Sequence, residues 1–308
     1  MDAVLAAPDR LMVQDDGLSI AEYVFAPQEA IVDSPRPSMM LRTHQGRPVT
    51  ASAPEDHPWH RGLSLALPYV GSSNFWGGPT YVHHDGYRAL PNHGIQRHRA
   101  WEILSHGRAG STETVRARES LEWISPSGER LLAEQRTLIV WPVSDGTWAV
   151  FWHSRLTNET HTPLSLGSPA TNGRLGAGYG GIFWRGSAAF RHGKFIGPSG
   201  EIDEREVSAR PADWLSMLSS DGEIGVLMAV DERSLWFARS DQYPGLGPAP
   251  FSRDERLLPP SEAITLAVTT AVIEGLAGCS DPLGHILEAA ERTADAHKRL
   301  HAESTAKA

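Results

Sequence analysis

The sequence contains little cysteine, fewer basic than acidic residues, and no long apolar run. Cys279 is the one cysteine among 308 residues, so no disulfide can form within the chain and no cysteine-based zinc site can be built. A single free cysteine is typical of a reducing compartment. No stretch reaches the roughly 18 apolar residues of a membrane helix, and the N-terminal segment lacks the apolar run of a signal peptide. We therefore expect a cytoplasmic protein without a membrane segment.

The charge balance excludes one class of partner. Lys and Arg total 28 against 37 Asp and Glu, which gives a net charge of -9 with histidine neutral. A nucleic-acid-binding protein needs a basic face toward phosphates, so no nucleic-acid partner is expected. Hydrophobic residues make up 40% of the chain, enough to fill the core of one large domain. The 29 glycines, 22 prolines and 10 tryptophans favour a β-rich protein that handles carbohydrate.

Alternation of apolar and polar residues predicts antiparallel strands along most of the chain. Tight turns around Gly128 and Gly146 join three long strands in the middle of the sequence. In the last of these, Trp148, Val150 and Trp152 share one face. The predicted strands are residues 18–25, 38–43, 63–67, 114–124, 130–141, 147–157, 182–185, 214–218, 225–230, 235–238 and 263–273.

One helix is expected, at the C-terminal end. Asp281 can cap it, Pro282 suits its first turn, and apolar residues recur at helical spacing to about His301. The strands before it predict an all-β fold, a large antiparallel β-sandwich in a single domain at residues 1–280. The helix and a frayed tail then occupy residues 281–308.

The segment 56–63, with the sequence DHPWHRGL, is the centre of the candidate site. Six of the 14 histidines lie between His57 and His98, and residues 68–97 are predicted to be mostly a long loop. A loop of this length in a compact domain is usually functional. A tight turn at the proline after His57 would bring its ring and that of His60 to one side.

Two chemical roles are open for these histidines. They can transfer protons as general acid and base, or they can bind one divalent metal ion together with His83. The spacing matches no strong metal-binding motif. Alternatively, these histidines have only a structural role, in which their rings hold the loop in place through hydrogen bonds to the backbone.

Two arginines and a tyrosine extend the candidate catalytic set. Arg61 and Arg185 can hold hydroxyl or carboxylate groups of a substrate, although Arg61 can equally pair with Asp56 or Glu55. Tyr179 lies between two glycines, where the backbone can approach a ligand closely. The candidate catalytic residues are His57, His60, Arg61, Glu134, Tyr179 and Arg185.

Glu134 is the strongest carboxylate candidate for acid–base work. It shares a strand face with Arg136, and a face with this much charge is expected to be solvated. Hydrolysis of a glycosidic bond usually needs two carboxylates. Asp85 and Asp213 are the candidates for the second one, and neither stands out.

Aromatic side chains can stack on the apolar face of a sugar ring. In a β-sandwich, however, a given tryptophan belongs more often to the core. Both interpretations apply to the tryptophans near the motif. The residues expected to bind substrate are Trp59, Asn74, Trp76, His84, Asp85, His98 and Trp184.

Several of these motifs together resemble a known bacterial family. The sequences DHPWHRGL at 56–63, NFWG at 74–77, YGG at 179–181 and WR at 184–185 resemble the family catalogued as "methane oxygenase PmoA-like" over roughly residues 35–275. Where members of that family often have histidine, this chain has Trp59. The resemblance implies a β-supersandwich similar to galactose mutarotase, in proteins that accompany sugar-oxidising dehydrogenases and sugar transporters. A true methane monooxygenase subunit spans the membrane, so methane oxidation is rejected.

We therefore predict a carbohydrate-active enzyme that acts on a sugar, glycoside or keto-sugar as a lyase, hydrolase or epimerase. The 57–98 loop and the 176–185 segment would form its cleft. The first alternative is a non-catalytic sugar-binding module. The second is a structural protein whose terminal helix docks on another chain. The expected partner is a small carbohydrate, and a homo-oligomer is compatible with the sequence.

Overall fold

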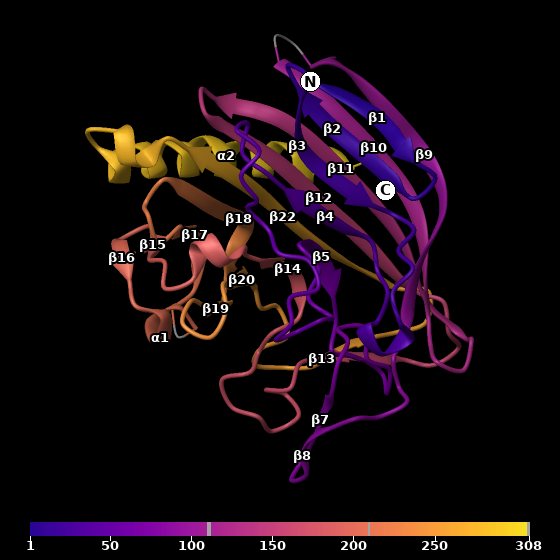
Figure 1. Ribbon diagram of the computed structural model, residues 1–308. Coiled ribbons are helices and arrows are strands. Elements are labelled where there is room, and N and C mark those ends of the chain that lie inside the picture. Colours follow the sequence, from indigo (N-terminus) through magenta and orange to yellow (C-terminus); the bar gives the residue numbers. More distant parts are fainter. Residues whose placement is uncertain (110–111, 209, 307–308) are drawn as a thin grey trace.

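Two antiparallel sheets form the body of the protein (Figure 1). The computed structural model describes residues 1–109, 112–208 and 210–306. Within these residues, the eight-stranded sheet has the order β1 (Asp2–Ala7), β2 (Arg10–Asp15), β3 (Leu18–Val24), β4 (Ser38–Leu41), β5 (Leu63–Ala66), β14 (Gly181–Arg185), β20 (Gly245–Pro248) and β19 (Trp236–Arg239). The nine-stranded sheet of the same residues has the order β16 (Gly200–Ile202), β15 (Phe195–Gly197), β17 (Ala212–Leu218), β18 (Ile224–Ser234), β22 (Ala263–Glu274), β12 (Thr147–Asn158), β11 (Arg130–Ser144), β10 (Thr112–Ile124) and β9 (Ile95–Ala109).

Smaller elements decorate the two large sheets. A short sheet contains β21 (Arg256–Leu258), β13 (Leu164–Gly167) and β6 (Tyr69–Val70), and a hairpin contains β7 (Thr80–Val82) and β8 (Gly86–Arg88). The helices are α1 (Glu204–Val207) and α2 (Pro282–Thr305), with single 3₁₀ turns at residues 31–33, 188–190 and 276–278. No helix in the described part of the chain is both long and apolar enough to cross a membrane.

The central strand β12 shows how the layers are held together. Trp148, Val150 and Trp152 point into a core that they share with residues of the eight-stranded sheet. Ala149 and Phe151 point to the other face of the nine-stranded sheet, where they join a second apolar cluster. The alternation predicted from the sequence is thus confirmed, and the predicted all-β sandwich is the fold observed.

Helix α2 covers the outer face of the nine-stranded sheet. The Asp281 side chain accepts a hydrogen bond from the Gly284 amide at 2.9 Å and caps the helix, as the sequence predicts. Ile286 and Ala290 pack against Phe151 and its neighbours on the sheet. One alternative from the sequence was that this helix docks on another protein chain. In the structure, it packs on the sheet of its own chain instead. It continues past the predicted end near His301 to Thr305, and residues 307–308 lie outside the described residues.

Several strands have no counterpart among the predicted ranges: the short strands β6, β7, β8, β13, β15, β16, β20 and β21, and the longer β1, β2 and β9. β1 and β2 precede the first predicted strand, and β1 exposes the apolar side chains Val4 and Leu5. β9, at the far edge of the nine-stranded sheet, is mostly exposed and begins inside the segment predicted to be loop. β1 and β9 are edge strands that are mostly exposed, and such strands do not need the two-residue period that burial of one face requires. β2 lies inside the sheet and buries Leu11 and Val13, but its run of three apolar residues hides the alternation.

Candidate functional site

A pocket of about 350 Å³ opens on the outer face of the eight-stranded sheet. On β14, Ile182 and Trp184 point into the core, whereas Phe183 between them points outward and joins the aromatic cluster of the pocket. The volume falls in the range of small-molecule sites. The lining residues are His57, Trp59, His60, Trp76, Gly77, Pro79, Tyr87, Arg174, Tyr179, Phe237, Arg239, Gln242 and Tyr243.

His57 and His60 stand side by side in this pocket. The His60 amide donates a hydrogen bond of 2.9 Å to the His57 carbonyl, which closes a tight turn at Pro58. The two imidazole rings stack with centroids 4.6 Å apart and an interplanar angle of 11°. The His57 side chain is 32% exposed, whereas His60 is 1% exposed as a residue. The turn thus presents one accessible and one buried ring at the same place.

One arginine anchors both histidines from behind. Arg185 Nη2 donates to both carboxylate oxygens of Asp56 at 2.9 Å each, and Arg185 Nη1 lies 3.3 Å from His60 Nδ1. Asp56 Oδ2 in turn lies 2.8 Å from His57 Nδ1. The ionised carboxylate can only accept, so His57 Nδ1 carries a proton and, in the neutral ring, Nε2 has the lone pair. The guanidinium can only donate, so His60 Nδ1 accepts and His60 Nε2 carries the proton.

Burial and these partners set the charge state of the site. Burial lowers the pKa of His60 well below its ordinary value, and the nearby His57 and Arg185 lower it further. This ring is therefore neutral at neutral pH. Burial acts to raise the pKa of Asp56, but hydrogen bonds from His57 and Arg185 outweigh it and leave the pKa lowered. Asp56 therefore stays ionised.

Two phenols complete the inner wall, and Arg185 supports one of them from behind. Burial raises the pKa of Tyr243 to about 12, and burial raises that of Tyr179 well above its ordinary value. Both hydroxyls stay protonated at neutral pH and can donate hydrogen bonds. The Arg185 guanidinium lies 4.4 Å from the centroid of the Tyr243 ring, so Tyr243 forms part of the support of the histidine pair.

The outer wall contains residues that sequence reasoning missed. Arg174 donates to the Tyr87 hydroxyl and stacks on the Tyr87 ring, and Tyr87 also contacts the hydroxyl of Tyr179 at 3.0 Å. Arg239 stacks on the ring of Phe237 at 4.5 Å. These residues come from segments far apart in the sequence and belong to no motif. Tyr87 lies on β8, Arg174 in the loop before β14 and Arg239 on β19, and no spacing in the sequence reveals that these segments meet.

Two of the predicted site residues, Asn74 and Arg61, do not line the pocket. Asn74 is buried, and its Oδ1 accepts hydrogen bonds from the amides of Trp76 and Gly77 at 2.8 and 2.9 Å. It therefore fixes the loop that carries the pocket residue Trp76. Arg61 points away from the pocket toward Glu29 and Asp33, at 3.5 and 3.6 Å, rather than toward Asp56 or Glu55.

Glu134 lies in the interior, and the prediction of a solvated face for it and Arg136 is wrong. Both are almost completely buried between the sheets, and Arg136 Nε donates to Glu134 Oε1 at 2.7 Å. Trp184 is a core residue with 0% exposure. His98 contacts Glu119 through its Nδ1 at 2.5 Å, also away from the pocket. None of these three candidates, Glu134, Trp184 or His98, lines the pocket described above.

The predicted metal ligands His57, His60 and His83 do not converge. His83 is exposed near the tip of the β7–β8 hairpin, beside the exposed His84 and Asp85, and its Nδ1 contacts the carbonyl of Asn172 at 2.9 Å. Among the described residues, a group whose histidine and carboxylate ligand atoms lie within 4.8 Å of one another exists elsewhere. It is the group formed by Asp231, His297 and His301.

Comparison with known families places this chain in a family of unknown function, DUF6807, which matches residues 10–280. The chain belongs to that family. The label "methane oxygenase PmoA-like", which the motifs suggested, is not confirmed. None of the curated proteins matches the chain.

Solved structures of similar shape are distant in sequence. The Slr1438 protein from Synechocystis sp. PCC 6803 has a TM-score of 0.40 and 9% identity, over 87% of this chain and 96% of that one. A galactose mutarotase related enzyme from Lactobacillus acidophilus has a TM-score of 0.43 and 8% identity, over 86% and 98%. A heparan sulfate lyase HepC mutant from Pedobacter heparinus has a TM-score of 0.44 and 9% identity, over 89% of this chain but 36% of the lyase.

Proposed function

We propose that the chain is a carbohydrate-active enzyme in which His57 removes a proton from a sugar carbon next to a carbonyl group. The observation that carries this proposal is the opposite protonation of two stacked imidazoles, set by one Arg185–Asp56 ion pair. Both Nδ1 atoms are turned toward that pair. The Nε2 lone pair of His57 and the Nε2 proton of His60 therefore lie together on the far edges of the rings.

The step that this pair supports is a β-elimination. His57 Nε2 takes the proton of the carbon next to the carbonyl, and the electron pair left behind forms an enolate. His60 Nε2 donates a hydrogen bond to the enolate oxygen, a role for which a neutral imidazole is suited. When the carbonyl forms again, the bond between the neighbouring carbon and its oxygen substituent breaks. The imidazolium of His57 then gives its proton to the leaving oxygen, and the product contains a carbon–carbon double bond.

The walls of the pocket support a carbohydrate as the substrate. Trp59, Trp76 and Tyr179 present aromatic surface to the cavity, and such rings pack against the apolar faces of sugars. Arg174 and Gln242 supply hydrogen-bond donors at the same cavity. An aromatic wall with donors at its rim matches a ring that is apolar on its faces and polar at its edge, so we assign a keto-sugar glycoside as the substrate class.

Hydrogen exchange tests the proposal before the natural substrate is known. Methyl glycosides oxidised to a ketone at one ring carbon are incubated with the protein in D₂O, and proton NMR follows loss of the signal next to the carbonyl. We expect exchange or elimination with wild type and a rate lower by about 10²- to 10⁴-fold with His57→Ala. His161→Ala, an exposed histidine outside the pocket, serves as the matched control and should match wild type.

Binding measurements on the same panel separate catalysis from mere recognition. If the protein binds these glycosides with equal affinity before and after His57→Ala, and no compound of the panel exchanges its proton, the enzyme assignment is wrong. That result would favour the sugar-binding module instead.

A further inference from the structure

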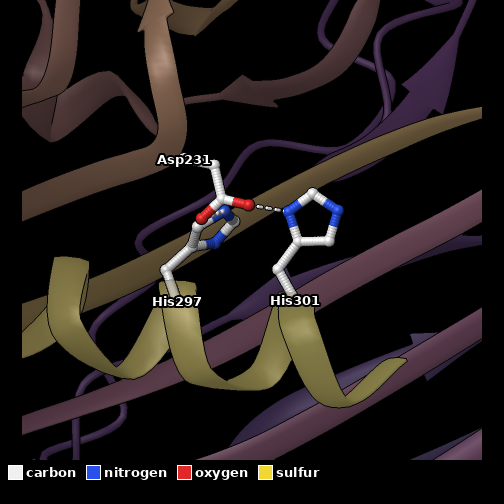
Figure 2. A group of neighbouring side chains, drawn as sticks. All are labelled: Asp231, His297 and His301. Atoms are coloured by element: carbon white, nitrogen blue, oxygen red, sulfur yellow. Dashed lines mark ion pairs between the residues drawn. The ribbon is translucent and has the colours of Figure 1, made fainter. Parts of the chain in front are cut away.

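A second polar site lies between helix α2 and strand β18, away from the pocket (Figure 2). His297 and His301 are four residues apart on α2, so they lie one turn apart on the same side of the helix. Figure 2 shows Asp231 of β18 between their two rings. His297 Nε2 lies 3.6 Å from Asp231 Oδ1, and His301 Nδ1 makes a close ion pair with Asp231 Oδ2.

Two inward atoms of this group lack hydrogen-bond partners. Asp231 Oδ1 and His297 Nε2 are buried atoms without a hydrogen bond to any described residue, and His301 Nδ1 beside them is paired with Asp231 Oδ2. Buried polar atoms are rarely left unsatisfied, because each costs free energy. Two of them converge here with His301 Nδ1, and one ligand atom from each of the three residues lies within 4.8 Å of the others. One cation at the centre of the group would satisfy both unsatisfied atoms and bind His301 Nδ1 as well.

A neighbouring hydroxyl orients one of the rings. Thr269 Oγ1 on β22 lies 3.0 Å from His297 Nδ1. When this nitrogen carries the proton and donates to the hydroxyl, the Nε2 lone pair faces Asp231. Metal-binding histidines usually engage their second nitrogen in this way, which fixes the tautomer and the ring orientation. This contact is independent of the two unsatisfied atoms and points to the same ligand.

We propose that Asp231, His297 and His301 bind a divalent transition-metal ion of the zinc class. Two imidazole nitrogens and one carboxylate oxygen form a donor set that zinc accepts in three-ligand sites. The ligands line a cavity of about 270 Å³, which leaves room for a further ligand on the ion. Because the ligands come from a helix and a strand, the ion cross-links α2 to the nine-stranded sheet.

Cobalt substitution tests this site directly. Untagged full-length protein is stripped with EDTA and titrated with Co²⁺, whose visible d–d bands report binding to nitrogen and oxygen ligands in a four- or five-coordinate site. We expect about one equivalent to bind, Zn²⁺ to displace it, and the affinity to fall at least about tenfold in Asp231→Asn and in His297→Ala/His301→Ala. His285→Ala, on the same helix but outside the group, should bind as wild type does.

A fourth variant locates the ion. His57→Ala/His60→Ala should retain the full Co²⁺ signal, because its histidines belong to the other pocket. Loss of the signal in that variant, or equal binding by wild type and Asp231→Asn, would overturn the proposal. Asp231→Asn keeps the shape of the side chain, so it gives a folded variant for comparison if the double histidine variant fails to fold. Circular dichroism confirms the folded state of each protein.

Discussion

At the scale of the residue, Arg185 determines the chemistry of the candidate site. Its planar guanidinium binds Asp56 through one terminal nitrogen and His60 through the other. The same side chain therefore holds in place the Asp56 carboxylate, which orients His57. It also makes His60 Nδ1 a hydrogen-bond acceptor. Since it does not line the pocket, its role is to position the two histidines rather than to contact substrate.

Arg185→Lys tests this positioning role. A lysine ammonium is a point charge without the planar fork, so it cannot hold both partners in the same geometry. We expect kcat for the keto-glycoside reaction to fall by about 10- to 100-fold with little change in KM, as for other outer partners of functional histidines. Steady-state kinetics measure both constants. Arg191→Lys, at an exposed arginine nearby, is the control, and equal kcat values in the two variants would contradict the assignment.

Asp56→Asn tests the tautomer of His57. The amide can donate as well as accept, so it no longer requires a proton on His57 Nδ1, and the lone pair on Nε2 is lost in part of the molecules. By analogy with the same change in the Ser-His-Asp triad, we expect kcat to fall by about 10²- to 10⁴-fold. Nitrogen-15 NMR of the imidazoles reports the tautomer independently of turnover. Glu55→Gln, the exposed neighbour, should leave both readouts unchanged.

The sequence predicted the centre of the site better than its walls. The spacing of His57 and His60 around a proline was enough to expect two rings on one side. From the sequence, Arg61 and Arg185 were equally good candidates to bind substrate groups. The structure distinguishes them, because Arg61 points toward Glu29 and Asp33. Arg174 and Tyr243 lie in the loops before β14 and between β19 and β20, and only the fold brings these distant segments to the pocket, without a local signal in the sequence.

At the scale of the element, two glycines allow the 74–80 loop to lie against the motif turn. A Cβ atom at Gly78 would lie 2.5 Å from the ring of Trp59, and the backbone there has a φ of +65°. Any larger residue must therefore displace Trp59, which lines the pocket. The adjacent Gly77 is equally close to Trp59. The NFWGG sequence is thus explained by close packing of one loop on another.

Gly78→Ala separates this packing effect from backbone strain. Gly46 also has a positive φ, +78°, but a Cβ atom added there would meet nothing within 4 Å, so Gly46→Ala reports the backbone cost alone. We expect urea denaturation to show a loss of about 1 kcal/mol for Gly46→Ala and about 2–4 kcal/mol for Gly78→Ala. Equal losses would show that contact with Trp59 contributes nothing.

Prediction of the elements succeeded for long strands with one buried face, and it failed for exposed edge strands such as β1 and for short strands such as β15. The strands of the central hairpins and the capped helix α2 were found because alternation and capping are local signals. The prediction that Glu134 and Arg136 face water was wrong. Their spacing of two residues shows that they share a strand face, but it does not show whether that face is solvated or buried with its charges paired. Only the packing of the second sheet decides this.

At the scale of the whole molecule, a buried polar cluster joins the two sheets. Arg136 of β11 donates to Glu134 on its own strand and to the Tyr23 hydroxyl of β3 at 2.7 Å, across the sandwich. Burial alone would lower the pKa of Arg136, but the charge of Glu134 and the neighbouring Tyr23 raise it, so the guanidinium stays charged. A fully paired charge at the centre of the core is costly to break.

Arg136→Met is expected to destabilise the fold by about 3–5 kcal/mol, because it leaves the buried Glu134 carboxylate without its partner. Arg130→Met removes an exposed arginine from the same strand, whose ion pairs with Glu122 and Glu159 lie at the surface, and should cost no more than about 1 kcal/mol. Urea denaturation of the two variants measures the difference. A smaller loss for Arg136→Met than for Arg130→Met would rule out a stabilising role for the cluster.

Buried neutral histidines make the stability of the whole molecule depend on pH. Burial and, to a smaller extent, the nearby His301 lower the pKa of His153 to about 4, and burial lowers that of His60 well below the ordinary 6.5. The unfolded chain therefore binds these protons more readily than the folded one. The stabilisation from each ring is fully present above about pH 6.5 and is lost as the pH falls toward the folded pKa, at about 1.4 kcal/mol per pH unit for each ring.

The free energy of unfolding, measured in EDTA between pH 7 and 5, should accordingly fall as the pH decreases. The slope gives the number of protons taken up on unfolding, and His153→Gln should reduce it by about one at the acidic end of this range. The exposed His161→Gln should leave it unchanged, because an exposed ring titrates alike in both states. A stability that is constant over this range in wild type would mean that water reaches the buried rings, and with them the His60 ring on which the proposed proton transfer depends.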